Sequence, residues 1–123
     1  MALELHGTTG VDLIQDGTVV TADLHSDVNS GVAKAWVNFN GTGTVAIRES
    51  YNVASITDNG TGNYNINFTT AMSDANYSAV TNDNYVGSIN HGTTFSTTSY
   101  QVVSRNSSGS EIDNANICSV VFR

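Results

Sequence analysis

A strict alternation of polar and apolar residues over 63–69 is the feature that most constrains the fold of this chain. Tyr64, Ile66 and Phe68 alternate with asparagines and a threonine, and an apolar residue at every second position is typical of a half-buried β-strand. The same period of two recurs over 33–40, where alternate residues are apolar. We therefore expect antiparallel strands that each turn one side chain in two toward a core.

Turn signals divide the rest of the chain into further short strands. The glycine-rich segments 41–44 and 58–62 predict hairpin connections, and Asn59-Gly60 is a tight-turn signal because both residues tolerate positive φ. About eight short strands with frequent turns predict an all-β fold, an antiparallel sandwich or small barrel. The candidate strands are 33–40, 44–47, 51–56, 63–69, 77–81, 85–89, 94–97, 100–105 and 117–122.

The composition points to one domain with a neutral polar surface. Only 12% of the 123 residues are charged, about half the average share, and the aromatic residues argue against disorder. The net charge is −7 and the four basic residues are scattered along the sequence, so we expect no nucleic-acid partner. No apolar run reaches the roughly 20 residues that span a bilayer, so we expect no membrane insertion. Residues 1–10 lack the basic start and apolar centre of a signal peptide, so we expect no export signal.

Residues 1–32 have too little apolar surface to fold alone. Thr21 is a candidate helix cap, and Leu24 and Val28 lie one turn apart on the same face of the short helix that would follow. A helix that short is marginal in isolation, so its apolar face implies a partner. We therefore divide the chain into a stalk, 1–32, and an antiparallel β head, 33–123.

Catalytic and metal-binding patterns are sparse. The histidines His6, His25 and His91 are far apart in sequence, and no common nucleophile or zinc motif occurs. We expect the carboxylates to occupy turns and caps, although the sequence does not exclude a glycosidase-type pair. Cys118 lies in an apolar run and is expected to be an inert core thiol. We predict a protein that is not an enzyme and that holds no metal and no cofactor, with an axial histidine site as the less favoured alternative.

Binding residues are better represented than catalytic ones. Two short polar segments, 82–85 and 90–93, combine an aromatic ring, a carboxylate, an imidazole and amides in what we expect to be loops. The alternative is that these two segments only form turns and that Tyr85 lies in the core. The candidate ligand-binding residues are Asp83, Asn84, Tyr85, Asn90 and His91.

Four segments resemble a known family. WVNFNGTGTVAIR, SITDNGTG, YNINFTTAM and, near the N-terminus, IQDGTVVTADL are similar to the recurring C-terminal module of bacteriophage tail-fibre proteins, especially those of marine and cyanobacterial phages. The segment FTTAMSDANYSAV is more loosely similar to the sandwich of H-type lectins. The resemblance implies a virion protein made in the bacterial host cytoplasm and assembled as a parallel homotrimer. Its head would attach the phage to a host cell-surface glycan or other receptor.

Trp36 lies on the polar side of its strand, which predicts a subunit interface or, less favoured, a ligand platform. The residues expected at the trimer interface are Leu13, Ile14, Val19, Leu24, Val28 and Trp36. The alternative function is a structural virion component, a capsid decoration or fibre adaptor that binds other virion proteins and no receptor.

Overall fold

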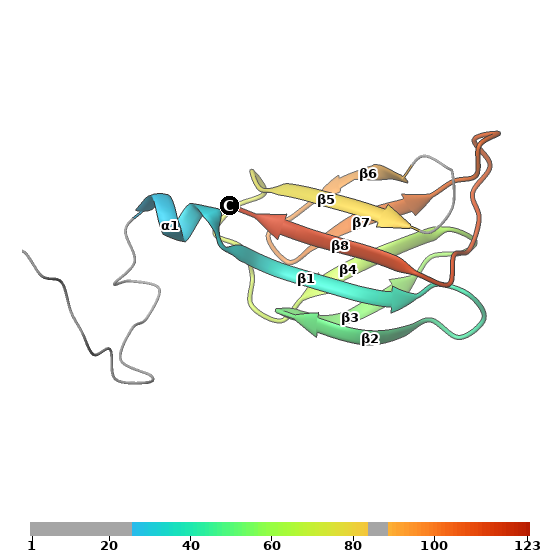
Figure 1. Ribbon diagram of the computed structural model, residues 1–123, viewed down its shortest axis with the longest axis horizontal. Helices are drawn as coiled ribbons and strands as arrows, with labels where there is room; N and C mark the ends of the chain where they lie inside the picture. Colours follow the sequence, from blue (N-terminus) through green and yellow to red (C-terminus); the bar gives the residue numbers. More distant parts are fainter. Residues whose placement is uncertain (1–25, 84–88) are drawn as a thin grey trace, which may run out of the picture.

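The computed structural model describes residues 26–83 and 89–123, which form one short helix and eight strands. In chain order they are α1 (Ser26–Gly31), β1 (Ala33–Asn40), β2 (Ala46–Tyr51), β3 (Val53–Asp58), β4 (Asn63–Phe68), β5 (Ser78–Asp83), β6 (Ile89–Phe95), β7 (Ser99–Ser104) and β8 (Ile117–Phe122). Strands pair in the order β2-β1-β8-β5 in sheet A and β3-β4-β7-β6 in sheet B. The sheets lie in two layers, sheet A nearer the viewer (Figure 1), which confirms the expected sandwich-like all-β fold.

The core lies between the sheets and follows the alternation in the sequence. Val37 and Phe39 of β1 meet Tyr64 and Ile66 of β4, and all four are at most 2% exposed. The rings of Phe39 and Tyr64 pack edge to face, with their centroids 5.3 Å apart, a favoured geometry for aromatic pairs. The predicted core faces of 33–40 and 63–69 are therefore confirmed.

The two predicted hairpins are present, with one difference in how they turn. Residues 41–45 join β1 to β2 and residues 59–62 join β3 to β4. In the second hairpin positive φ falls on Gly60 and Gly62 rather than on Asn59. The turn is closed by Asn63, whose N–H donates to the carbonyl of Gly60, so the turn lies where Asn59-Gly60 predicted it, although Asn59 itself does not take positive φ.

The second and third strands each begin two residues later than expected. The second strand was expected at 44–47 but lies at Ala46–Tyr51, and the third was expected at 51–56 but lies at Val53–Asp58. β2 is an edge strand in which Arg48 and Glu49 are exposed, and a bulge at Asn38/Phe39 of β1 shifts its register. The hydrogen bonds to β1 therefore extend β2 to Tyr51, although its residues show no regular alternation of apolar and polar side chains.

The segment 90–93 is not the loop that its composition predicted. Its backbone belongs to β6, where Asn90 pairs with Val103 and His91 pairs with Val102 of β7. The register shifts between His91 and Phe95, so the turn-forming residues make an irregularity within a strand rather than a hairpin. Residues 85–88 of the expected strand 85–89 lie outside the described residues.

A single residue, Asn52, carries the chain from sheet A to sheet B. Its φ is +54°, a conformation that asparagine tolerates better than most residues. The side-chain Nδ2 donates to the carbonyls of Lys34 and Thr70, at 3.1 and 3.2 Å, while Oδ1 accepts from the N–H of Thr70 at 2.7 Å. Asn52 therefore fixes the corner and ties it to β1 and to the β4–β5 connection.

We expect Asn52→Ala to lower the free energy of unfolding by about 2–3 kcal/mol, because it removes three hydrogen bonds and keeps a strained φ. Asn52→Gly, which relieves the φ strain but also loses the bonds, should cost less. Urea unfolding followed by circular dichroism measures both. If the glycine variant is no more stable than the alanine variant, backbone strain contributes nothing at this corner.

The N-terminal predictions fall mostly outside the described residues. Thr21 and Leu24 lie there, and the described helix is α1. Lys34 follows it and donates from Nζ to the carbonyl of Asn29 at 2.6 Å, which suits the negative end of a helix. No helix within 26–83 or 89–123 has the length and apolar character needed to cross a membrane.

Candidate functional site

The outer face of sheet B is covered by amides and hydroxyls. Because side chains alternate along a strand, the asparagines of β4 point away from the core that Tyr64 and Ile66 fill. Antiparallel pairing places residues of β3 and β7 beside them. We call this surface the amide face, and it comprises Ser55, Thr57, Asn63, Asn65, Asn67, Ser99 and Gln101.

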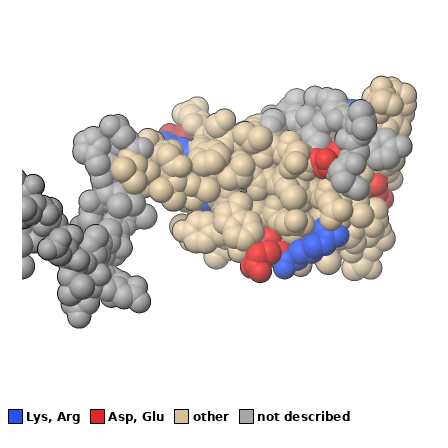
Figure 2. Space-filling view, viewed as in Figure 1, with Lys and Arg blue, Asp and Glu red and all other residues tan. Residues whose placement is uncertain are grey.

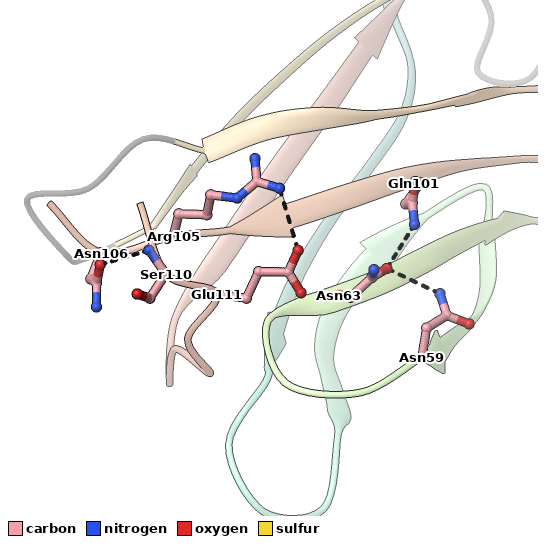
Figure 3. Close-up of polar contacts among 7 residues, drawn as sticks. All are labelled: Asn59, Asn63, Gln101, Arg105, Asn106, Ser110 and Glu111. Carbon is pink, nitrogen blue, oxygen red and sulfur yellow. Dashed lines mark hydrogen bonds and ion pairs between the residues drawn. The ribbon is translucent and has the colours of Figure 1, made fainter. Parts of the chain in front are cut away.

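Most side chains at the two ends of the amide face hold one another. Asn67 Nδ2 donates to Thr57 Oγ1 at 2.9 Å and to Ser55 Oγ at 3.1 Å. Figure 3 shows Gln101 and Asn59 both pointing at Asn63, whose Oδ1 accepts from Gln101 Nε2 at 2.8 Å. These bonds limit side-chain motion and present a preorganised polar surface.

Asn65 lies in the middle of this face and differs from its neighbours. Its strand register places it between Thr57 of β3 and Gln101 of β7. Its side chain is half-buried and makes no hydrogen bond to any residue in 26–83 or 89–123. A side-chain amide offers two donors and an acceptor oxygen, so Asn65 is the residue of the face best placed to bond a ligand.

Strand β5 ends at the predicted ligand residue Asp83, on the side of the sandwich opposite α1 (Figure 1). Its Oδ2 accepts from Ser104 Oγ at 2.8 Å and from Asn114 Nδ2 at 2.9 Å, and Asn114 also donates to Ser104 Oγ at 2.7 Å. Ser104 and Asn114 are buried. Asp83 thus anchors the β7–β8 connection, and its ligand-binding role stays a prediction.

A second polar cluster holds the same connection from the inside. The Tyr64 hydroxyl lies 2.8 Å from Asp113 Oδ1 and 2.9 Å from the carbonyl oxygen of Gly41, and it shares its hydrogen between them. Burial, reinforced by the Asp113 carboxylate, raises the pKa of Tyr64 well above its ordinary value. The N–H of Gly62 donates to the same carboxylate oxygen at 2.7 Å. These bonds hold the β7–β8 connection against β4 and the β3–β4 turn.

The outer part of this connection is stiffened by its own side chains. Arg105 and Glu111 form an ion pair at 3.3 Å, and Asn106 Oδ1 accepts from the N–H of Ser110 at 3.0 Å (Figure 3). Both contacts close the loop across its base. The β7–β8 connection therefore keeps a defined shape beside the amide face.

The structure does not test whether the other predicted ligand residues come together. Asn84 and Tyr85 lie outside the described residues, and of Asn90 and His91 only the backbone pairing with β7 is described. Whether these side chains share a site with Asp83 stays a prediction.

The outer face of sheet A is apolar instead. Register pairing places Tyr51, Trp36, Val120 and Val80 in one row across all four strands. Trp36 is 37% exposed, Tyr51 57% and Val80 58%, and Phe122 lies on the same face. Figure 2 shows the middle of this face without charge; charged groups lie at its lower edge, along β2, and at its two ends. We call it the apolar face, and it confirms that Trp36 points away from the core.

Cys118 also lies on this face, which corrects the expectation of a core thiol. It is half-buried and pairs with Asn38 of β1 and Asn82 of β5. The apolar run 117–122 alternates in burial, with Ile117 and Val121 inward, so Cys118 takes the outward position. With Trp36 it lines a shallow groove of about 280 Å³.

Of the predicted trimer residues, Val28 and Trp36 lie in the described part, and Val28 is 54% exposed. Leu13, Ile14, Val19 and Leu24 lie outside it. The apolar face adds Tyr51, Val80 and Phe122, which the sequence did not single out as surface residues.

Asp58 and Asp74, two of the aspartates expected in turns, are found in turns. Asp58 Oδ1 accepts from the N–H of Gly60 at 2.9 Å, and Asp74 Oδ1 accepts from the N–H of Asn76 at 2.7 Å. Arg123 also pairs with Asp74 and holds the pKa of its carboxyl below the usual range. Among the described side chains, no three histidine, cysteine or acidic groups gather in a way that could hold a metal ion.

The sequence contained a signal for the amide face in the repeated asparagines of 63–67, which were read only as the solvent side of a strand. The contribution of Thr57 and Gln101 had no such signal, because it depends on strand order.

In comparison with known proteins, no family model, no curated protein and no solved structure matches the chain. Its function is therefore inferred from the chemistry of its surfaces.

Proposed function

We propose that this chain is the head of a trimeric bacteriophage tail fibre, a non-enzymatic virion protein that attaches the particle to a glycan on the host cell surface. The observation that carries the proposal is the amide face, with the half-buried and unbonded amide of Asn65 at its centre. The resemblance of the segments around 36–48 and 55–72 to tail-fibre modules supports the same class.

The chemistry of the amide face suits sugars. A sugar presents hydroxyl groups that both donate and accept, and side-chain amides can match both roles. The amides of Asn67 and Gln101 are already oriented by internal bonds, so little side-chain entropy is lost on binding. Within the face there is no charged side chain among its seven residues, which favours a neutral hydroxyl-rich ligand.

A single shallow face of this kind binds weakly, and assembly would compensate. Three copies that engage one cell surface raise the apparent affinity by roughly 10²–10⁴ without any new contact. The apolar face offers the surface for that assembly, because exposed aromatic and branched side chains in one patch mark protein interfaces.

We expect Asn65→Ala to weaken the binding of a single head to host polysaccharide by roughly fivefold, the value of one neutral hydrogen bond. Adhesion of the assembled trimer to intact bacteria should fall by a larger factor, because the loss is multiplied over three sites. Asn116→Ala, the same change at an exposed residue just before β8, is the matched control and should bind normally.

The predicted loop site is tested in the same assay with Tyr85→Ala and His91→Ala. If these two variants lose adhesion and Asn65→Ala does not, recognition lies in the loops and the amide face is only scaffold. If the wild-type protein binds neither cells nor surface glycans, the adhesin proposal fails. Shortening of the polysaccharide on incubation would instead point to an enzyme.

The apolar face also favours the second candidate, a capsid decoration or fibre adaptor that binds only virion subunits. Such a protein needs an exposed interface and no receptor site, and the row from Tyr51 to Val80 would serve. Binding of the purified protein to capsid or tail lattices, without binding to host cells, would support this alternative.

Trp36→Lys should dissociate the trimer at micromolar concentration, with association weakened at least about thirtyfold, because a buried charge replaces a central interface aromatic. Sedimentation measures the mass. Thr44→Lys adds the same charge to an exposed loop residue and should leave the trimer intact. A stable wild-type monomer at micromolar concentration would contradict the trimer.

A further inference from the structure

A hollow of about 330 Å³ opens at the α1 end of the sandwich, and none of its lining residues belongs to the amide face or the apolar face. The start of β1 pairs there with the end of β8, through Ala33 and Phe122, so Lys34 and Arg123 come to line the same hollow. Asn52 and Met72 are among its other lining residues. Its volume lies at the lower end of the range for small-ligand sites, which fits a single sugar ring.

Two of the four basic residues of an acidic chain converge on this hollow. Lys34 Nζ donates to the carbonyl oxygen and to Oδ1 of Asn29, both at 2.6 Å. Both partners are uncharged, and no ion pair is formed by Lys34 with any described residue. The positive charge of Lys34 is therefore not neutralised within the described structure.

Both cations keep hydrogen-bond donors to spare. An ammonium carries three N–H groups and a guanidinium five, and Lys34 uses two of its three on Asn29. Arg123 donates from Nε to Asp74 Oδ1 at 3.1 Å and from Nη2 to Asp74 Oδ2, which leaves its Nη1 without a partner among the described residues. With Asp74 counted, the side chains give the hollow a net charge of +1, although the whole chain carries −7.

We propose that this hollow binds the anionic group of an acidic sugar, a carboxylate or phosphate substituent held between Lys34 and Arg123. The inference rests on the proposed glycan-binding function and adds a second, charge-selective contact to the neutral amide face. The sugar ring would lie over Met72 and Asn52, and the hydroxyl of Ser73, which also lines the hollow, could hydrogen-bond to it.

The test is a titration of the ¹⁵N-labelled protein followed by NMR, with glucuronic acid, glucose 6-phosphate and glucose as probes. We expect the two acids to shift the amide signals of 29–34 and 71–74, with affinity that falls as salt is added, and glucose to leave them unchanged. The stronger of the two acids identifies whether carboxylate or phosphate is the preferred group.

Two variants with a matched control separate a binding site from a structural one. Lys34→Gln should weaken acid binding at least about fivefold, whereas Arg105→Gln removes a distant cation of the same charge and should change nothing. Asp74→Asn keeps the oxygen that accepts from Asn76 but removes a negative charge from the hollow, so it should tighten binding by about threefold. A thermal melt of each variant checks that it folds.

The proposal is overturned if glucose shifts the same signals equally, or if Lys34→Gln and Arg105→Gln titrate alike. It is also overturned if Asp74→Asn, being folded, binds no more tightly than the wild type. These results are separable from the proposed function: adhesion lost in Asn65→Ala but kept in Lys34→Gln leaves the adhesin standing without this site. If the protein binds the acids but adheres to no cell, the hollow stands as a binding site and the adhesin proposal fails.

Discussion

Gly62→Ala should destabilise the protein by roughly 3–5 kcal/mol, a large part of the total stability of a domain of this size. The φ of Gly62 is +68°, which costs an L-residue about 1–2 kcal/mol. In addition, a Cβ at this position would lie 2.6 Å from both the Ile112 nitrogen and the Ser104 carbonyl oxygen. Both are backbone atoms and cannot rotate away, so the close packing of the β7–β8 connection would be broken.

Gly43→Ala is the matched control, because its φ is +62° and nothing lies within 4 Å of the added carbon. It carries the same backbone strain without the clash and should cost about 1 kcal/mol. Urea unfolding of the two variants measures the difference directly. Equal midpoints would show that the contact with Ser104 and Ile112 is not part of the folded state.

The second large effect is a loss of stability at alkaline pH. Tyr64 and Tyr100 are 0% and 1% exposed, and burial raises the pKa of both phenols well above the ordinary 10.0. The neutral phenol is thus favoured in the folded state, while both tyrosines ionise in the unfolded chain near pH 10. Their contribution to stability is fully present below about pH 10 and is lost as the pH rises toward the folded-state values.

Above about pH 10 each of the two tyrosines should lower the free energy of unfolding by about 1.4 kcal/mol per pH unit. Urea unfolding at several values between about pH 8 and about pH 11 gives the slope. Tyr100→Phe should reduce the slope by about 1.4 kcal/mol per pH unit, whereas Tyr51→Phe, which removes a tyrosine 57% exposed, should leave it unchanged. A flat profile up to pH 11 in the wild type would contradict the burial of both phenols.

The core and the fold class were accessible from the sequence because both depend on periods along one strand. The alternation of Tyr64, Ile66 and Phe68 predicted which side chains are buried, and the glycine pairs predicted two hairpins. The predictions failed where composition conflicted with a partner strand. The turn-forming residues 90–93 were drawn into β6 by pairing with β7, because the hydrogen bonds of a neighbouring strand outweigh local propensity.

Cys118 shows the same limit in one residue. Its apolar neighbours suggested a core position, yet in a strand every second residue points outward whatever its character. Which of the two sets faces the core depends on the register with β1 and β5. The apolar run was recognised, and the side to which its thiol points was not.

By itself, the sequence determined an all-β chain with a predictable core, a neutral surface and few groups for chemistry. The tertiary structure alone decided which distant residues share a surface: Thr57, Asn65 and Gln101 on the amide face, and Lys34 beside Arg123 in the hollow. The physical reason is that periodicity acts within a strand, whereas a surface runs across strands. Its members are chosen by strand order and register, which arise only when the two sheets pair and pack.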